Sequence, residues 1–320
     1  MFPWLKNNRL FYLAQTGRLP HMLIVIVLGI IIIFVSQLGG IPIYIAQIFL
    51  YGFSETGIHQ PETMSATLSG LWMAALLISS FAGIFLFLWL WVRFAEKRPF
   101  SSLGFERKNA IFTYLRGFVL GLLMFSAAIG LLAVLGFVQI DRSIDPSMVG
   151  LSALGGVLII LVGWLVQGAA EEVLVRGWML PVLAARYHRW LGIIISSLIF
   201  AILHGLNPNI SALAFLNLTL FGFFAAFYAM REGSLWGICA LHSSWNWIQG
   251  NIFGFEVSGG SMGGGTIIKL MDTGPDWMTG GLFGPEGGLA VTIVLVIGII
   301  VIFAWPFKVD EENIPAIQQD

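Results

Sequence analysis

Charged residues are scarce in this 320-residue sequence. Asp, Glu, Lys and Arg together make up 10% of it, while hydrophobic residues make up 58%. An ordinary soluble domain carries about 25% charged residues, so this composition excludes a soluble globular protein. The formal net charge of −1 argues against a nucleic acid as a partner. We therefore predict an all-α, polytopic membrane protein that lies in a lipid bilayer.

Cysteines, cleavage signals and internal repeats are also few or absent. Cys239 is the only cysteine, which excludes an internal disulfide and says nothing about the cellular compartment. The first apolar run, 22–38, is not followed by a small-residue cleavage site of the Ala-x-Ala kind. We therefore expect this run to be retained as a helix. No internal repeat is evident.

Eight apolar stretches are interpreted as membrane-crossing helices. They are 22–38, with an apolar tail to residue 51 after a break at 39–42, then 67–91, 110–138, 148–179, 191–204, 210–230, 235–248 and 288–307. With eight crossings and both termini inside, only Arg142 and Lys269 of the sixteen Lys and Arg residues lie outside. Because Lys and Arg concentrate in cytoplasmic loops, the sequence predicts that both termini are cytoplasmic.

The chain divides into three regions at its charged and glycine-rich connectors. Residues 1–109 form an N-terminal two-helix membrane region with a charged connector, residues 110–250 form a helical core, and residues 251–320 hold a glycine-rich outer segment, the last helix and a short tail. A structureless segment as long as 251–287 is either functional or disordered, and we expect a mobile outer loop rather than a gate. We expect Pro181 to kink or end the fourth helix, with 182–190 at the membrane interface.

Two adjacent carboxylates, Glu171 and Glu172, lie at the end of an apolar run and are followed by Arg176. An ionisable group inside a bilayer costs roughly 2.5–3.5 kcal/mol, so such groups persist where they are paired or used. Residues four apart share a helix face, which predicts an ion pair between Glu172 and Arg176. Glu171 is left without a local cation. The alternative is a purely structural ion pair with a second carboxylate at the water interface.

Two histidines lie in other apolar runs. His204 ends the fifth predicted helix, one turn after Phe200, and His242 lies in the seventh, one turn before Asn246. A single histidine on an apolar helix is more often a packing residue than a catalyst. Three separate helices that each carry polar groups at membrane depth are a much rarer coincidence. We therefore predict one buried polar cluster inside the helical bundle.

These motifs carry a resemblance to a known family. Glu-Glu-x-x-x-Arg, Phe-x-x-x-His and His-x-x-x-Asn follow one another on successive membrane helices between Glu171 and Asn246. The ordered set is similar to the CAAX prenyl protease type 2 and bacteriocin-processing (Abi, CPBP) family of intramembrane endopeptidases, in its bacterial form. The loop at 98–105 also resembles one found in many bacterial members. The resemblance implies a plasma-membrane protease acting on a membrane-associated peptide or protein, with 110–250 as its catalytic core.

Peptide hydrolysis needs a base that activates water and donors that hold the developing oxyanion. Glu171 suits the base, because an unpaired carboxylate in a dry site accepts a proton readily. His204 can orient the same water. His242 and Asn246 lie one turn apart and can direct donors at a single oxygen. The family assigns matching roles to the matching residues. Glu172, Arg176 and Phe200 are expected to support the site, Phe200 as packing or as a wall against the substrate.

The same cluster is also suited to bind zinc. Glu171, His204 and His242 would supply one carboxylate and two imidazoles and leave a position open for water, as in a metalloprotease. The sequence has no His-Glu-x-x-His motif, and Asn246 is a poor zinc ligand. We therefore favour a metal-free, glutamate-type mechanism without a cofactor, with Zn²⁺ as the alternative.

Two functions other than proteolysis use the same residue types. Buried Glu and His line the paths of transporters and proton relays. Such proteins often show repeated halves, which this chain lacks. The second alternative is a scaffold that binds other membrane proteins without cleaving them. The sequence names no substrate, and both prenylated CAAX tails and peptides of bacteriocin maturation or immunity stay open.

Overall fold

The computed structural model describes residues 2–54, 57–58, 64–105 and 109–304, and these are almost entirely helical. The helices are α1 (Pro3–Lys6), α2 (Arg9–Gln15), α3 (Met22–Gln37), α4 (Ile41–Tyr51), α5 (Ala66–Leu90), α6 (Ala110–Val134), α7 (Leu154–Glu172), α8 (Leu180–Arg186), α9 (Arg189–His204), α10 (Ala212–Glu232), α11 (Trp236–Trp247), α12 (Asp276–Thr279) and α13 (Leu289–Ala304). Wider π-helical turns follow three of them, at Trp91–Glu96, Val173–Met179 and Ile248–Ile252. The all-α prediction is confirmed.

Among the described residues, strands are confined to two short antiparallel pairs outside the bundle. β1 (Phe53–Ser54) pairs with β2 (Gly57–Ile58). β3 (Val138–Ile140) pairs with β4 (Leu270–Asp272), with Gln139 opposite Met271. The second pair joins the connector after α6 to the long segment after α11. The third helix therefore ends at Val134, four residues earlier than predicted.

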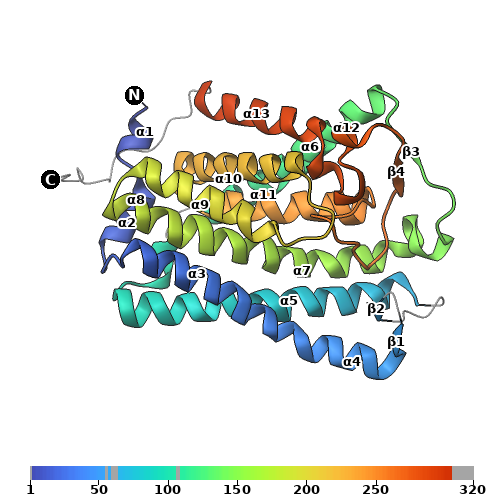
Figure 1. The fold of residues 1–320 in the computed structure, drawn as a ribbon, viewed down its shortest axis with the longest axis horizontal. Coiled ribbons are helices and arrows are strands. Elements are labelled where there is room, and N and C mark those ends of the chain that lie inside the picture. Colours follow the sequence, from blue (N-terminus) through green and yellow to red (C-terminus); the bar gives the residue numbers. More distant parts are fainter. Residues whose placement is uncertain (1, 55–56, 59–63, 106–108, 305–320) are drawn as a thin grey trace.

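The long helices lie side by side in one bundle (Figure 1). α3, α4 and α5 form one side of it, α13 lies at the opposite side, and α7, α9, α10 and α11 lie between them. The beginning of α3 and the end of α13 both lie at the left end in this view, where α8 also lies. Because these two points lie at the same end, the chain passes through the bundle an even number of times between them.

Five helical stretches are long and apolar enough to cross a membrane, namely Met22–Tyr51, Ala66–Glu96, Ala110–Val134, Gly150–Arg186 and Ala212–Glu232. Arg189–His204 and Leu289–Ala304 are shorter apolar helices. The protein is thus an integral membrane protein. α11, the seventh predicted crossing, is in neither group. Its side chains are buried by other helices from Gly237 to Asn246, so it needs no apolar surface for lipid.

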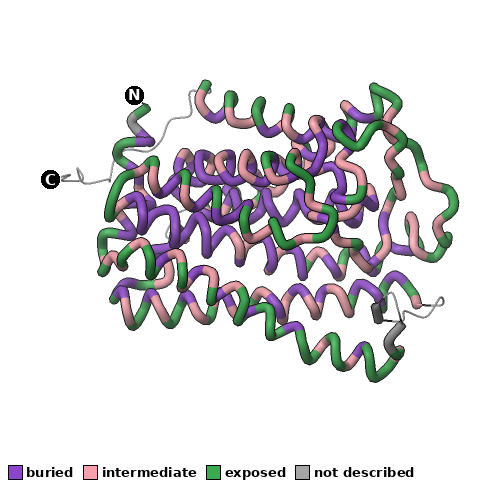
Figure 2. The backbone as a smooth tube through the Cα atoms, in the orientation of Figure 1, coloured by how far each residue is buried: buried purple, intermediate pink, exposed green. Residues whose placement is uncertain are grey.

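Burial decreases from the centre of the bundle to its sides (Figure 2). The exposed residues of the outer helices are largely apolar, with Phe49 of α4 90% exposed and Phe112 of α6 69% exposed. In a soluble protein such surfaces would aggregate, whereas lipid tails cover them at no cost. The outer surface therefore matches a hydrocarbon environment.

Small residues bring α11 into close contact with its neighbours. A Cβ on Gly117 of α6 would lie 2.0 Å from the carbonyl oxygen of Gly237, and one on Gly168 of α7 would lie 2.7 Å from Oγ of Ser243. Neither position has room for a side chain. Close backbone approach through small residues is a common way for membrane helices to associate. It places the His242 turn of α11 directly beside the Glu171 turn of α7.

Pro181 was expected to kink or end the fourth helix, and it does not end it. A continuous helical stretch runs from Gly150 to Arg186, with the π-helical turn Val173–Met179 immediately before α8. Proline lacks an N–H and its ring clashes with the carbonyl four residues earlier, but a widened turn at that place moves this carbonyl away. Val182 and Leu183 are fully buried, so 182–190 does not begin as an interfacial segment.

The segment 251–287, predicted as a mobile loop, is folded against the bundle. It contains β4, α12 and short 3-10 turns. Phe255, Val257 and Phe283 are buried, and the Asn251 side chain donates to the carbonyl oxygens of Gly263 and Gly265 at 2.9 and 3.0 Å. Buried aromatic side chains and internal hydrogen bonds fix the path of this chain. The segment is therefore part of the wall around the site.

Candidate active site

The predicted ion pair between Glu172 and Arg176 is present. Nη1 of Arg176 lies 2.9 Å from Oε1 of Glu172, and neither side chain is exposed. The same carboxylate oxygen lies 2.8 Å from Nδ1 of His242 on α11. An ionised carboxylate only accepts hydrogen bonds, so we assign a proton to Nδ1 of His242. Nε2 of His242 then faces away from Glu172, toward Glu171.

Phe200 covers the arginine of this pair. The Arg176 guanidinium lies 4.5 Å from the centre of the Phe200 ring, within cation–π distance. The Phe200 ring is also 4.5 Å from the His204 ring and 6.0 Å from the His242 ring, measured between centroids. Phe200 therefore packs among the charged and imidazole groups and holds them in place.

Glu171 points toward both histidines. Its Oε2 lies 3.9 Å from Nε2 of His204 and 3.8 Å from Nε2 of His242. Within the part of the chain that the structure describes, this oxygen is buried and has no hydrogen-bond partner. Nδ1 of His204 lies 2.8 Å from the Phe200 carbonyl oxygen, which can only accept, so Nδ1 carries the proton. Oε2 of Glu171 and the Nε2 atoms of the two histidines therefore converge at one place.

Asn246 is connected to Glu171 through Gln167, a residue that the sequence motifs did not indicate. Nδ2 of Asn246 donates to Oε1 of Gln167 at 2.9 Å, and Nε2 of Gln167 donates to Oε1 of Glu171 at 2.8 Å. The carboxylate fixes the direction of these two hydrogen bonds. An ionised Glu171 requires a donor, so Gln167 donates to it with its amide nitrogen and accepts from Asn246 with its amide oxygen. The i, i+4 spacing of Gln167 and Glu171 on α7 was the available signal.

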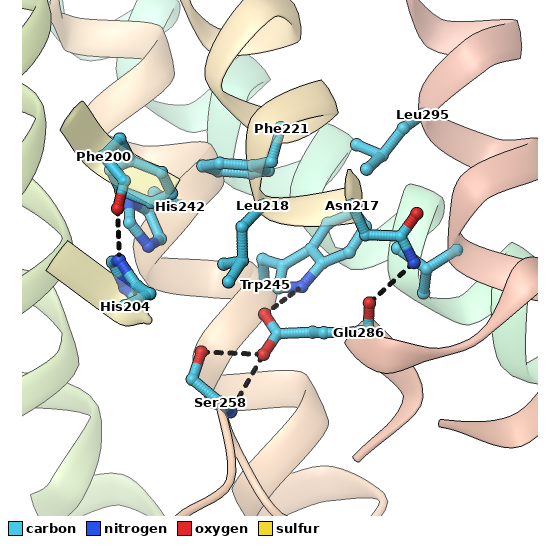
Figure 3. A pocket seen from close by; sticks show the side chains of 11 residues that line it. Phe200, His204, Asn217, Leu218, Phe221, His242, Trp245, Ser258, Glu286 and Leu295 are labelled. Carbon is cyan, nitrogen blue, oxygen red and sulfur yellow. Dashed lines mark hydrogen bonds between the residues drawn. The ribbon is translucent and has the colours of Figure 1, made fainter. Parts of the chain in front are cut away.

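A cavity extends from the two histidines between α9, α10, α11 and α13 (Figure 3). It is lined by Phe200, His204, Asn217, Leu218, Phe221, His242, Trp245, Ser258, Glu286, Val291 and Leu295. The wall between its two ends is largely apolar. Glu286 comes from the segment that was predicted to be a loop, so nothing in the sequence pattern pointed to it. The cavity therefore reaches the two histidines of the polar cluster from the side of α10 and α13.

Residues 153–248 match the family model described as type II CAAX prenyl endopeptidase Rce1-like. The family assignment is confirmed for this part of the chain. The Rce1-like domain contains every residue of the polar cluster, from Gln167 on α7 to Asn246 on α11. Glu286 lies outside it. No curated protein and no solved structure matches the chain.

The family implies CAAX-type intramembrane endopeptidase activity and a membrane-associated protein as substrate. All seven predicted site residues of the Rce1-like domain lie in one connected cluster. Four of them, Glu171, Glu172, His204 and His242, are linked through the distances given above. The contact between α11 and α7 brings Glu172 and His242 together from 70 positions apart in the chain.

A zinc ion does not fit the three predicted ligands as they stand in the Rce1-like domain. Ligand atoms around a tetrahedral Zn²⁺ with bonds of 2.0–2.2 Å lie about 3.4 Å apart. Oε2 of Glu171 is 3.8 and 3.9 Å from the two imidazole nitrogens. Across the described residues, no group of three or more His, Cys, Asp or Glu is arranged to hold a metal ion. We therefore derive no catalytic step through a metal.

Proposed function

We propose that this protein is an intramembrane endopeptidase that hydrolyses a peptide bond of a membrane-associated peptide or protein by a metal-free, glutamate-type mechanism. The observation that carries the proposal is the convergence of Glu171 Oε2 with Nε2 of His204 and Nε2 of His242. At separations of 3.8 and 3.9 Å these atoms are too far apart for direct hydrogen bonds and close enough to share one water molecule.

In this mechanism Glu171 is the general base. A water molecule held by Oε2 of Glu171 and Nε2 of His204 gives a proton to the carboxylate while its oxygen attacks the carbonyl carbon of the substrate. The protonated Glu171 then returns the proton to the nitrogen of the leaving group as the C–N bond breaks. His204 orients the water, because its Nδ1 donates to the Phe200 carbonyl and leaves Nε2 to accept.

Asn246 and His242 stabilise the oxyanion. Asn246 spends one of its two amide hydrogens on Gln167 and keeps the second for the carbonyl oxygen of the substrate. His242 can donate from Nε2 only as an imidazolium. The Glu172 carboxylate, 2.8 Å from its Nδ1, stabilises this charged form. Glu172 therefore acts through His242, while Arg176 and Phe200 hold Glu172 in position.

Gln167 is a positioning residue in this scheme. It donates to Oε1 of Glu171 and thereby keeps Oε2 turned toward the histidines. It also accepts from Asn246 and fixes the orientation of that amide. One side chain thus sets both the base and an oxyanion donor, which come from different helices.

We further propose that the site works from a bacterial plasma membrane with both termini on the cytoplasmic side. The support for the orientation is the position of Arg142 and Lys269 in connectors at the end of the bundle opposite the beginning of α3 and the end of α13. The bacterial source rests on the resemblance of the motifs alone.

The test is cleavage of a fluorogenic, membrane-tethered peptide library by purified protein in liposomes. Glu171→Gln should lower single-turnover cleavage by about 10²–10⁴-fold, the usual contribution of a general base. Its thermal unfolding should stay close to wild type, because glutamine keeps the size of the side chain and can still accept the hydrogen bond from Gln167. Glu256→Gln, a carboxylate of the segment after α11 that does not line the cavity, is the matched control.

The same assay is repeated after dialysis against a chelator, with elemental analysis of the protein. We expect activity to persist and zinc to be below one ion per chain. One tightly held Zn²⁺ whose removal and return abolish and restore cleavage would make the enzyme a metalloprotease. If the wild type cleaves no peptide, or Glu171→Gln keeps more than a few per cent of activity, the proposed mechanism is wrong.

A further inference from the structure

The cavity beside the histidines has two chemically different ends. His204 and His242 lie at one end, and the carboxylate of Glu286 lies at the other, between Trp245 and Ser258 (Figure 3). The wall between them carries Leu218 and Phe221 from α10, with further apolar residues from α13. A largely apolar wall thus joins the histidine end of the cavity to a negative charge at the other end.

Glu286 is held in one orientation by neutral groups. Its Oε1 accepts from Nε1 of Trp245 at 3.1 Å, and its Oε2 accepts from the backbone N and Oγ of Ser258, both at 2.9 Å. Its backbone carbonyl accepts from Nδ2 of Asn217 at 2.7 Å. These contacts fix the carboxylate without neutralising it, because every donor is uncharged.

The carboxylate lacks a cationic partner in the described part of the chain, where no Lys, Arg or His nitrogen lies within 4.0 Å of it. This distinguishes it from Glu96, Glu172 and Glu232, the carboxylates that are buried most deeply. Glu96 is paired with Arg98, Glu172 with Arg176, and Glu232 with Arg116. A negative charge in a largely apolar cavity is stabilised most by a cation that enters with a ligand.

We propose that this cavity is a side-chain subsite that selects a long basic residue, lysine or arginine, next to the scissile bond of the substrate. The apolar stem of such a side chain would contact Leu218 and Phe221, and its charged head would reach Glu286. The carboxylate keeps lone pairs for one more hydrogen bond beyond the three that it accepts. This inference rests on the proposed proteolytic function and assigns a specificity to the same site.

The test compares peptides that differ at one position. Matched membrane-tethered peptides carry lysine, norleucine or glutamate beside the scissile bond, and kcat/KM is measured for each with wild type, Glu286→Gln and Glu256→Gln. The kcat/KM of the wild type should be at least tenfold higher for lysine than for norleucine. About one charge-assisted hydrogen bond contributes such a factor. Glu286→Gln should bring this ratio close to one, and Glu256→Gln should leave it unchanged.

The ratio does not depend on how much of a variant is folded, because both peptides meet the same enzyme molecules. Equal loss of activity on all peptides in Glu286→Gln would show that the residue only fastens the segment after α11, and the inference would be overturned. It would also be overturned if the wild type did not prefer lysine. In either case Glu171-dependent cleavage of the norleucine peptide would leave the proposed function standing.

Binding supplies a readout that does not require catalysis. The lysine and norleucine peptides are bound to Glu171→Gln protein in detergent, with and without the additional Glu286→Gln change. Tighter binding of the lysine peptide that is lost with Glu286 supports the subsite even if no cleavage occurs. Equal binding of the two peptides contradicts it.

Discussion

The outer helices of this bundle are more apolar than the central helices, yet fewer of their residues are buried. In the most apolar 18-residue stretch of Met22–Tyr51, which contains α3 and α4, 22% of the residues are buried. In the corresponding stretch of Ala212–Glu232, which is α10, 61% are buried. α11 is too polar to count among the apolar helices, yet it is buried from Gly237 to Asn246.

This difference has a simple physical origin. A helix that faces lipid must be apolar around most of its surface, whereas a helix that faces protein can carry polar groups if each finds a partner. Glu172, Arg176 and Ser243 are fully buried, and each is hydrogen-bonded. In this protein high apolarity therefore marks the boundary with lipid, and polarity marks the centre where the site lies.

The largest effect on stability is expected from Arg176→Leu in the centre. The change leaves Glu172 as a buried charge with His242 as its remaining partner, and breaking a buried pair typically costs about 3–5 kcal/mol. Thermal unfolding in detergent measures the loss. Arg93→Leu, at an exposed arginine in the π-helical turn after α5, is the matched control and should change little. Adding Glu172→Gln to Arg176→Leu should restore part of the stability. If the double variant is no better, the two residues are not energetically coupled.

The next effect is on turnover. Asn246→Ala should lower single-turnover cleavage by roughly 10²–10³-fold, or about 2.7–4 kcal/mol of transition-state stabilisation, with little change in substrate binding. Asn246→Asp should be worse, because it replaces a donor with an acceptor that repels both the oxyanion and Oε1 of Gln167. A proton relay predicts the reverse order, since aspartate can carry protons. Wild-type activity in Asn246→Asp would show that Asn246 does not stabilise the oxyanion.

A smaller effect is expected from Gln167→Met, which keeps the size of the side chain and removes its hydrogen bonds. Misplacing a catalytic group by about 1 Å costs up to about 100-fold in rate, so we expect kcat to fall by about 10–100-fold with KM unchanged. Gln167→Glu should fall further, because it places a second carboxylate against Glu171. The kcat and KM of both variants are measured on one peptide. Unchanged kcat in the methionine variant would mean that Gln167 only fills space.

The smallest effect compares two faces of one outer helix. Ile32 of α3 is 3% exposed and its neighbour Ile31 is 49% exposed. Ile32→Val should cost about 0.5–1.5 kcal/mol, because a methyl group is removed from a packed interior. Ile31→Val should cost less than about 0.5 kcal/mol, since lipid replaces the lost contact. Equal losses in thermal unfolding would show that the Ile31 face is covered by protein rather than lipid.

Local spacing predicted part of the site correctly. The pair of Glu172 and Arg176 follows from an i, i+4 spacing on one helix, and the bond from Gln167 to Glu171 has the same spacing and was overlooked. Both depend on helix geometry alone. The count of eight crossings stays a prediction. The apolar pattern counted 235–248 as a crossing, whereas the five stretches of the described chain that are long and apolar enough to span a membrane do not include α11.

Composition and residue spacing alone determined the all-α membrane class, the order of the motifs and the ion pair within the fourth helix. These properties arise from contacts of a residue with lipid or with its own helical turn. Only the tertiary structure decided that His242 shares Glu172 with Arg176, that Asn246 reaches Glu171 through Gln167, and that Glu286 lines the cavity. These contacts join groups from separate helices and from a folded connector. Their distances depend on how closely the helices pack, which the small residues on α6, α7 and α11 permit and no local pattern specifies.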